Sequence, residues 1–253
     1  MNIGIIQFNQ EFENPENNIV AINEILDSSL SNEDILIFPE MTLTGFTMKS
    51  DEFAEEINGT ATKFFIHLSS KLKKHIFAGI IERDGSNIYN SLVHFDPHGL
   101  IMARYRKIHP FTFSNENKFF TAGTEPVVTQ IDRLNIGLSI CYDLRFPELY
   151  RQYAKQKVDI MLNIANWPVP RINHWQQLLQ VRAIENQCFM IGANRVGQDP
   201  YNYYNGHSAI YDPMGNEVIL AVHEEGLISS QIDLEKIESM RKQFPFLADM
   251  KLV

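Results

Sequence analysis

Three residues far apart in the sequence, Glu40, Lys107 and Cys141, have the side chains that a thiol-based hydrolysis requires. A thiol can attack a carbonyl carbon, a carboxylate can take the thiol proton and return it to a leaving amine, and an ammonium group can stabilise the developing oxyanion. A lysine close to a thiol is also expected to lower the thiol pKa. Because no histidine accompanies Cys141 in the pattern of a papain-like protease, Glu40 is the predicted base.

The three residues each follow a segment with the composition of a strand. Cys141 follows the apolar run 136–140, Glu40 follows residues 34–38, and Lys107 ends a series of short β runs over residues 76–107. In α/β sheets, the loops at the carboxyl ends of strands converge on ligands. The alternatives are that Cys141 is a small core residue and that Glu40 and Lys107 face solvent.

The elements that would position these residues follow from the hydrophobic periodicity. Strands are predicted over residues 3–8, 34–38, 75–82, 136–140, 158–164 and 187–193, and helices over 15–30, 61–74, 147–156, 172–185 and 234–243. Turn sequences predict a hairpin over 211–223, and residues 111–127 have no period and are predicted to form a long functional loop. This order indicates a layered α/β fold, and no Pro-, Gly- or Ser-rich linker divides residues 1–253, so one domain is expected.

The composition and the net charge disfavour several classes of protein. Hydrophobic residues make up 44% and charged residues 21% of the chain, and the formal net charge of −9 disfavours a nucleic-acid-binding surface. No apolar run is long enough to cross a bilayer and no basic leader is present, so we expect a cytoplasmic protein without membrane contact. The two cysteines are expected to remain thiols, and since no Cys/His cluster has metal-ligand spacing, neither a metal nor a cofactor is expected.

Four phrases of the sequence together resemble one family. ILIFPEMTLTGF, YRKIHPF, SICYDLRFPELYR and NWPVPRINHWQQLLQVRAIENQ are similar to the motif set of the carbon–nitrogen hydrolases, also called the nitrilase superfamily, and occur in the family's order. The resemblance implies a four-layer α-β-β-α sandwich and a Glu-Lys-Cys triad at Glu40, Lys107 and Cys141. It also implies a homodimer in which two sandwiches pack through their helical layers.

Within the family, CYDLRFPELYR followed by NWPxxR resembles the bacterial omega-amidase type. This resemblance implies hydrolysis of the terminal amide of a small keto-acid amide, 2-oxoglutaramate or 2-oxosuccinamate, through a cysteine thioester. The alternatives are a deaminated-glutathione amidase or other small aliphatic amidase, a nitrilase proper, and a catalytically silent binding scaffold. The segment between Lys107 and Cys141 is shorter than in many relatives, so the resemblance does not predict which residues form the outer wall of the pocket.

Three further residues have predicted roles beside the triad. Glu116 resembles the second glutamate that family members place beside the lysine, and its alternative is a solvent-facing loop residue. The backbone N–H of Tyr142 is expected to be a second oxyanion donor, since it follows the nucleophile directly. Cys188 lies in an apolar run without a base or cation beside it, so it is predicted to be a structural and inert thiol.

Two arginines compete for the carboxylate of the substrate, because a guanidinium fork matches two carboxylate oxygens. Arg171 is preferred, since it follows Trp167 and two prolines in a stiff loop where the indole would form an aromatic wall. The alternative is that Arg171 begins the next helix and is exposed to solvent. Arg145 is predicted to have a structural role, pairing with Asp143 or Glu148 to brace the turn of the nucleophile.

Overall fold

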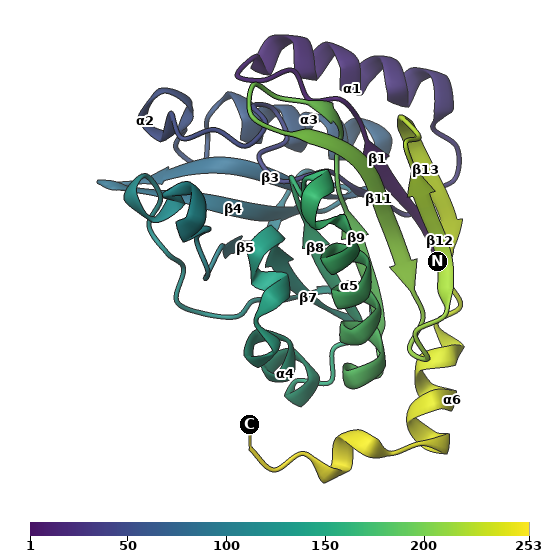
Figure 1. The fold of residues 1–253 in the computed structure, drawn as a ribbon. Coiled ribbons are helices and arrows are strands. Elements are labelled where there is room, and N and C mark those ends of the chain that lie inside the picture. Colours follow the sequence, from purple (N-terminus) through teal and green to yellow (C-terminus); the bar gives the residue numbers. More distant parts are fainter. Residues whose placement is uncertain (253) are drawn as a thin grey trace.

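The computed structural model describes residues 1–252, which form two β-sheets packed between layers of helices (Figure 1). The first sheet has the strand order β13-β1-β2-β3-β4-β5. Its strands are β1 (Asn2–Gln7), β2 (Ile35–Ile37), β3 (His75–Asp84), β4 (Asn87–Phe95), β5 (Ile101–Arg106) and β13 (Gly226–Gln231). Strands β1, β2 and β3 are parallel, and antiparallel strands extend the sheet on both sides.

The second sheet has the order β10-β11-β9-β8-β7-β6, and β12 pairs with β11. Its strands are β6 (Val128–Ile131), β7 (Leu134–Ile140), β8 (Ile160–Ile164), β9 (Phe189–Ala193), β10 (Val196–Gln198), β11 (Tyr203–Tyr211) and β12 (Glu217–Val222). Strands β7, β8 and β9 are parallel. Each sheet therefore has a parallel centre, whose strands end at one common edge.

Helices cover the outer face of each sheet. They are α1 (Pro15–Ser29), α2 (Ser50–Phe53), α3 (Thr60–Leu72), α4 (Pro147–Lys155), α5 (Ile172–Asn186) and α6 (Glu235–Gln243). Helices α1 and α3 pack on the first sheet, and α4 and α5 pack on the second (Figure 1). None of the helices described within residues 1–252 has the length and apolar character needed to cross a membrane.

Strand β2 shows how the sequence builds these layers. Ile35 and Ile37 belong to the core cluster that contains residues of both sheets, whereas Leu36 and Phe38 pack with the helices on the outer face. Successive side chains of a strand point to opposite faces, so a strand that is apolar at every position is buried on both sides. The predicted α-β-β-α sandwich is thereby confirmed.

The predicted helices and most predicted strands are present, with ends shifted by a few residues. The prediction missed β6, β10, β11 and β13, and in and before β11 polar residues and glycine interrupt the apolar alternation. Residues 111–127 do form the expected long loop. Its only regular structure is two short 3₁₀ turns, η1 (Thr112–Ser114) and η2 (Glu116–Lys118).

Candidate active site

Cys141 lies directly after β7, at the start of the 3₁₀ turn η3 (Cys141–Arg145). Its φ of +45° is in the left-handed region, where a residue with a side chain costs about 1 to 3 kcal/mol. The buried carboxylate of Asp143 holds this turn, since its Oδ2 accepts hydrogen bonds from Ile140 N at 2.9 Å and from Tyr105 Oη at 2.7 Å. Tyr105 belongs to β5, so the contact ties the turn to the strand that leads to the predicted lysine.

Glu40 follows β2 and is completely buried. Its Oε1 accepts hydrogen bonds from Lys107 Nζ at 2.9 Å and from Asn90 Nδ2 at 2.7 Å, and its Oε2 accepts one from Asn166 N at 2.9 Å. A buried carboxylate needs such donors to offset its lost hydration. The three donors also hold the carboxylate in one orientation.

The backbone that carries Glu40 is clamped as well. Gln10 Nε2 donates to the carbonyl oxygens of Glu40, Met41 and Thr42, each at 3.1 Å. A Cβ atom at position 79 would lie 2.5 Å from Met41 N, so only glycine allows β3 to approach this closely. The loop after β2 is therefore fixed against its neighbouring strand.

Lys107 joins this carboxylate to a second one. It is 1% exposed, and its Nζ donates to Glu116 Oε1 at 3.1 Å and Oε2 at 2.9 Å as well as to Glu40. Glu116 is completely buried, so it is not the solvent-facing loop residue considered as the alternative. Residues from β2, β5 and the loop 111–127 thus form one buried charged cluster, with Cys141 beside it.

Burial and neighbouring charges shift the pKa values of Lys107 and Cys141. Burial alone would lower the pKa of Lys107, but Glu116 and Glu40 outweigh it and raise that pKa, so the ammonium keeps its charge. Burial and the adjacent Glu40 raise the pKa of Cys141 well above its usual range. Lys107 acts in the lowering direction, as the sequence predicts, but burial and Glu40 outweigh it, so the net shift of the thiol pKa is upward. The resting thiol therefore holds its proton at neutral pH and needs a base.

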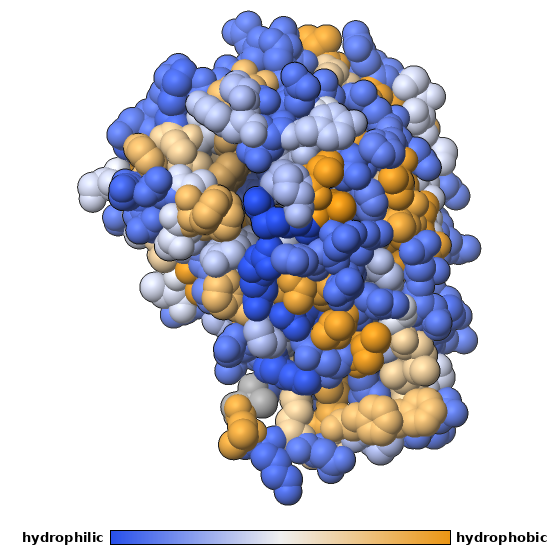
Figure 2. Space-filling view, in the orientation of Figure 1, coloured by the Kyte–Doolittle hydropathy of each residue, from blue (hydrophilic) through white to orange (hydrophobic). Residues whose placement is uncertain are grey.

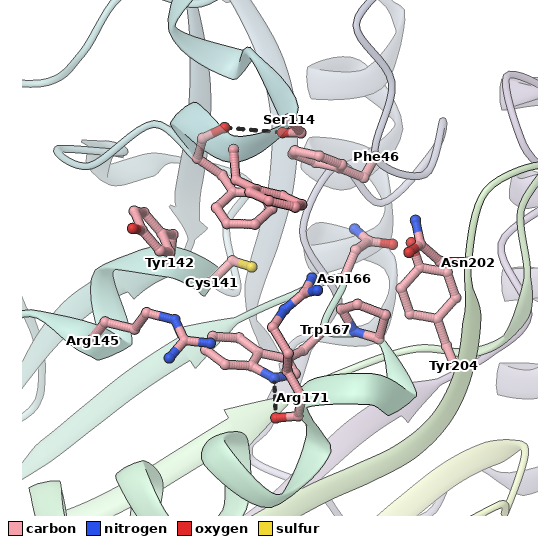
Figure 3. Close-up of a pocket in the computed structure, with 13 residues that line it drawn as sticks. Phe46, Ser114, Cys141, Tyr142, Arg145, Asn166, Trp167, Arg171, Asn202 and Tyr204 are labelled. Atoms are coloured by element: carbon pink, nitrogen blue, oxygen red, sulfur yellow. Dashed lines mark hydrogen bonds between the residues drawn. The ribbon is translucent and has the colours of Figure 1, made fainter.

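The thiol opens onto a pocket of about 180 Å³, which suits a small molecule. Figure 2 shows a hollow on this face of the molecule, with hydrophobic residues on one margin and hydrophilic residues on the other. Aromatic rings form much of the wall, and Arg145 and Arg171 provide positive charge. In Figure 3 the sulfur of Cys141 and the guanidinium group of Arg171 are directed into the same space.

Arg145 does not have the structural partners that the sequence analysis assigns to it. The carboxylate of Asp143 is occupied by Tyr105, by Ile140 N and by His109, and Arg145 lines the pocket instead. The Arg145 guanidinium lies 4.8 Å from the centre of the Trp167 ring. Partial burial and the nearby charge of Arg171 lower the pKa of Arg145. The predicted pairing is therefore wrong, and Arg145 is a second positively charged side chain of the pocket.

Arg171 ends the 3₁₀ turn η4 (Val169–Arg171), just before α5, and lines the pocket. Its guanidinium lies 5.4 Å from the centre of the Phe111 ring. Trp167 Nε1 donates to the Arg171 carbonyl oxygen at 2.8 Å, which fixes the loop between them (Figure 3). Trp167 is 3% exposed and forms part of the wall. Tyr142 follows Cys141 in η3, and its ring packs between Phe111 and Phe146.

Cys188 lies in the core of the second sheet, away from the pocket. It is completely buried, and burial raises its pKa to about 12. Both cysteines are free thiols. No group of three or more His, Cys, Asp or Glu side chains within the described residues is arranged to hold a metal ion.

Sequence reasoning missed several residues of the site. Asn90 and Asn166 donate to Glu40, and Phe46 and Tyr204 line the pocket. Asn166 stands beside Trp167 in the loop already singled out, which is a signal that could have found it. Asn90 lies in β4, where Asn87, Ser91 and His94 are also polar, so no local signal in the sequence distinguishes it.

Comparison with known proteins identifies the family. The carbon-nitrogen hydrolase family profile matches residues 2–242. The chain belongs to the carbon-nitrogen hydrolase family. It is 34% identical over 251 residues to a 2-oxoglutaramate amidase of Bacillus subtilis, with 98% of this chain and 97% of the relative covered. It is also 34% identical over 230 residues to an omega-amidase of Yersinia enterocolitica, covering 89% and 88%.

The comparison with solved structures indicates the same family as the comparison of sequences. This carbon-nitrogen hydrolase superposes with a TM-score of 0.95 on a CN-hydrolase superfamily protein of Xanthomonas campestris, whose structure carries an arsenic adduct in the active site. The two are 28% identical, and the comparison covers 100% of this chain and 98% of the other. The protein is therefore an enzyme that hydrolyses carbon–nitrogen bonds.

Replacement of Glu116 tests its place in the cluster of this hydrolase. Glu116→Gln keeps the size of the side chain but removes one of the two charges that hold Lys107, so turnover is expected to fall by about 10²-fold or more. Steady-state kinetics and thermal unfolding measure the two effects, and the melting temperature should change little by comparison. Glu125→Gln in the exposed part of the same loop is the control. A near-normal rate for Glu116→Gln would exclude a catalytic contribution of this carboxylate.

Proposed function

We propose that the protein hydrolyses a small amide through a covalent thioester on Cys141. The observation that carries the proposal is the buried Glu40–Lys107–Glu116 cluster beside a protonated strand-end thiol, at a pocket that contains two arginines. Glu40 takes the thiol proton, the sulfur attacks the amide carbonyl, and a tetrahedral oxyanion forms. Glu40 then gives that proton to the nitrogen, and ammonia leaves as the thioester forms.

The second half of the reaction uses the same groups. Glu40 takes a proton from water, the hydroxide attacks the thioester carbonyl, and the proton returns to the sulfur as the acid product departs. Glu116 and Glu40 raise the pKa of Lys107, so its ammonium is charged in the resting site, and it stabilises the oxyanion in both halves. The backbone N–H of Tyr142, directly after the nucleophile, is the proposed second donor.

The two arginines indicate the class of amide. Within residues 1–252 neither the Arg145 nor the Arg171 guanidinium forms an ion pair with a protein carboxylate, although both line the pocket. Unpaired guanidinium groups in a small pocket favour an anionic ligand. A short keto-acid amide, 2-oxoglutaramate or 2-oxosuccinamate, has a carboxylate at the end opposite its amide. Two similar proteins are named 2-oxoglutaramate amidases, which supports the same class.

A panel of substrates tests this function directly. Ammonia release is measured for 2-oxoglutaramate, 2-oxosuccinamate, a deaminated-glutathione analogue, an uncharged amide and an aliphatic nitrile. The proposal expects the highest kcat/KM for one of the two keto-acid amides. A preference for the nitrile or the larger amide would assign the protein to one of those alternatives, and no release from any compound would support the silent scaffold.

Arg171→Met tests how the substrate carboxylate is bound. Loss of a charge-assisted contact costs about 2 to 5 kcal/mol, which corresponds to roughly a thirtyfold to several-thousandfold fall in kcat/KM. The loss is expected for 2-oxoglutaramate and not for pentanamide, which has the same chain length but no carboxylate. Arg145→Met, measured on the same pair, is the matched comparison. An equal loss on both amides, or on neither, would exclude Arg171 as the carboxylate-binding residue.

The remaining expectations concern assembly and location. We propose that two copies pack through their helical layers, and the partly exposed apolar residues Val181 and Ile184 on α5 support this. Sedimentation velocity should then give the mass of a dimer, and a monomer at micromolar concentration would contradict it.

The proposed location is the cytoplasm, which is consistent with two free thiols. The proposed reaction uses neither a metal nor a cofactor.

A further inference from the structure

Asn90 occupies a special place in the charged cluster. It lies in β4, is 1% exposed, and its Nδ2 donates to Glu40 Oε1 at 2.7 Å and to Glu116 Oε1 at 3.0 Å. Its backbone oxygen also accepts a hydrogen bond from Lys107 N at 2.9 Å. One residue therefore contacts all three charged members of the cluster.

The charges of the cluster explain why a neutral donor is needed there. Two carboxylates share one ammonium group in a buried site, where like charges repel strongly. The Asn90 amide places both of its N–H bonds between the carboxylates. Its Oδ1 has no partner within the described residues. An unpaired buried oxygen is unfavourable, but the flipped amide would set oxygen against the carboxylate oxygens, which is worse.

We propose that Asn90 is a positioning residue that keeps the two carboxylates together without a shared proton, so that Glu40 remains available as the base. The inference rests on the proposed mechanism, in which Glu40 takes the Cys141 proton. Asn90 contacts the proposed base directly, so its effect is expected on Glu40.

The electrostatics agree with this role. Burial and the charge of Glu40 raise the pKa of Glu116, and the hydrogen bond from Asn90 opposes that rise. The titratable groups around the amide are Glu40 after β2, Glu116 in η2, Lys107 after β5 and Cys141 in η3. Lys107 and Cys141 both keep their protons near neutral pH. Loss of the Asn90 donor would therefore be answered by proton uptake on the carboxylate pair, which removes the base.

Asn163 in β8 provides a matched control. It is also completely buried, its Nδ2 also donates twice, at 3.0 Å to Ser139 Oγ and at 3.1 Å to Tyr150 Oη, and its Oδ1 also has no partner within residues 1–252. Its partners are hydroxyl groups instead of carboxylates. Asn163→Ala therefore removes the same amide from a similar environment without changing the proton balance of the cluster.

The test measures the pH dependence of Cys141 alkylation by iodoacetamide, followed by mass spectrometry, for wild type, Asn90→Ala, Asn90→Ser and Asn163→Ala. Because the thiol displaces iodide at the methylene carbon of the reagent and does not attack an amide carbonyl, the reading does not depend on the proposed substrate. In Asn90→Ala the acid limb of the profile, where the alkylation rate falls with falling pH, is expected to lie about one pH unit higher than in wild type. At a pH below the limb, the variant is then alkylated about tenfold more slowly. Asn90→Ser, which can donate only one hydrogen bond, should give a smaller shift, and Asn163→Ala none. The kcat/KM profile should shift in the same way, with KM nearly unchanged.

Several outcomes separate this inference from the proposed function. If the limb is abolished in Glu40→Gln but unchanged in both Asn90 variants, the mechanism stands and the role of Asn90 is wrong. An equal shift of the acid limb in Asn163→Ala would show that Asn90 has only a structural role. If wild type has no acid limb, Glu40 is not the base, and both the mechanism and the inference fail. Should Asn90→Ala not fold, Asn90→Ser alone distinguishes these cases.

Discussion

Cys141→Ala is expected to lower kcat/KM for 2-oxoglutaramate by on the order of 10⁴-fold or more, because the covalent route has no other nucleophile. Cys141 is the thiol that opens onto the pocket, and its pKa is raised by burial and by Glu40, so the loss should appear at every pH tested. Ammonia release under steady-state conditions measures it. The substitution removes only a sulfur atom at a strained position, so the fold should be retained in thermal unfolding.

Cys188→Ala is the matched control for this variant. Cys188 is the other free cysteine, but it is completely buried among apolar residues of the second sheet. Its loss should leave kcat/KM unchanged, and iodoacetamide at limiting concentration should label Cys141 first. Full activity of Cys141→Ala would refute the mechanism, and preferential labelling of Cys188 would reverse the assignment of the two thiols.

Glu40→Gln is expected to have the second largest effect, a fall of about 10² to 10⁴-fold in kcat, which is the usual contribution of a general base. The amide is nearly isosteric with the carboxylate but cannot take the Cys141 proton. It also turns one acceptor atom into a donor, and this atom would face donors, since Lys107, Asn90 and Asn166 N all point at the carboxylate. KM should change less than kcat, because the substrate carboxylate is bound elsewhere.

Intact-protein mass spectrometry adds a direct test of the intermediate. Wild type quenched during turnover, or Glu40→Gln incubated with substrate, should carry an acyl group on Cys141, since Glu40 is also needed for the attack of water on the thioester. A Glu40→Gln variant with wild-type turnover would exclude Glu40 as the base. An adduct on any other residue would contradict the proposed covalent route.

The sequence alone placed the three residues of the triad at the ends of β-segments. This was possible because strand patterns are local: an apolar run such as residues 136–140 shows where a buried strand ends. Glu40 and Lys107 follow strands of the first sheet and Cys141 follows a strand of the second, so each strand end places its residue at a sheet edge and the packing of the two sheets brings the three together. The four motif phrases added the family and its layered fold, which local periodicity does not provide.

Only the tertiary structure decided which other side chains join the site. Glu116 lies in a loop without a period, and its burial depends on the contacts with Lys107 and Phe111 N. Asn90 donates to residues 50 and 26 positions away, across strand and loop boundaries that no local pattern encodes. Such contacts depend on strand register, which a slip of one residue would reverse.

The two arginines show the same limit. The sequence alone favoured Arg171 for the pocket because it follows a stiff, aromatic loop, and it assigned Arg145 to a brace with Asp143 or Glu148 because Arg145 lies in the family phrase CYDLR. In the structure Tyr105 of the other sheet and the backbone N–H of Ile140 donate to the Asp143 carboxylate, and Arg145 lies against the ring of Trp167. The sequence by itself therefore determined the family, the layers and the strand ends that carry the chemistry. The packing of the two sheets determined the partners of each charge, because a buried charge is satisfied by whichever groups the fold brings within hydrogen-bond distance.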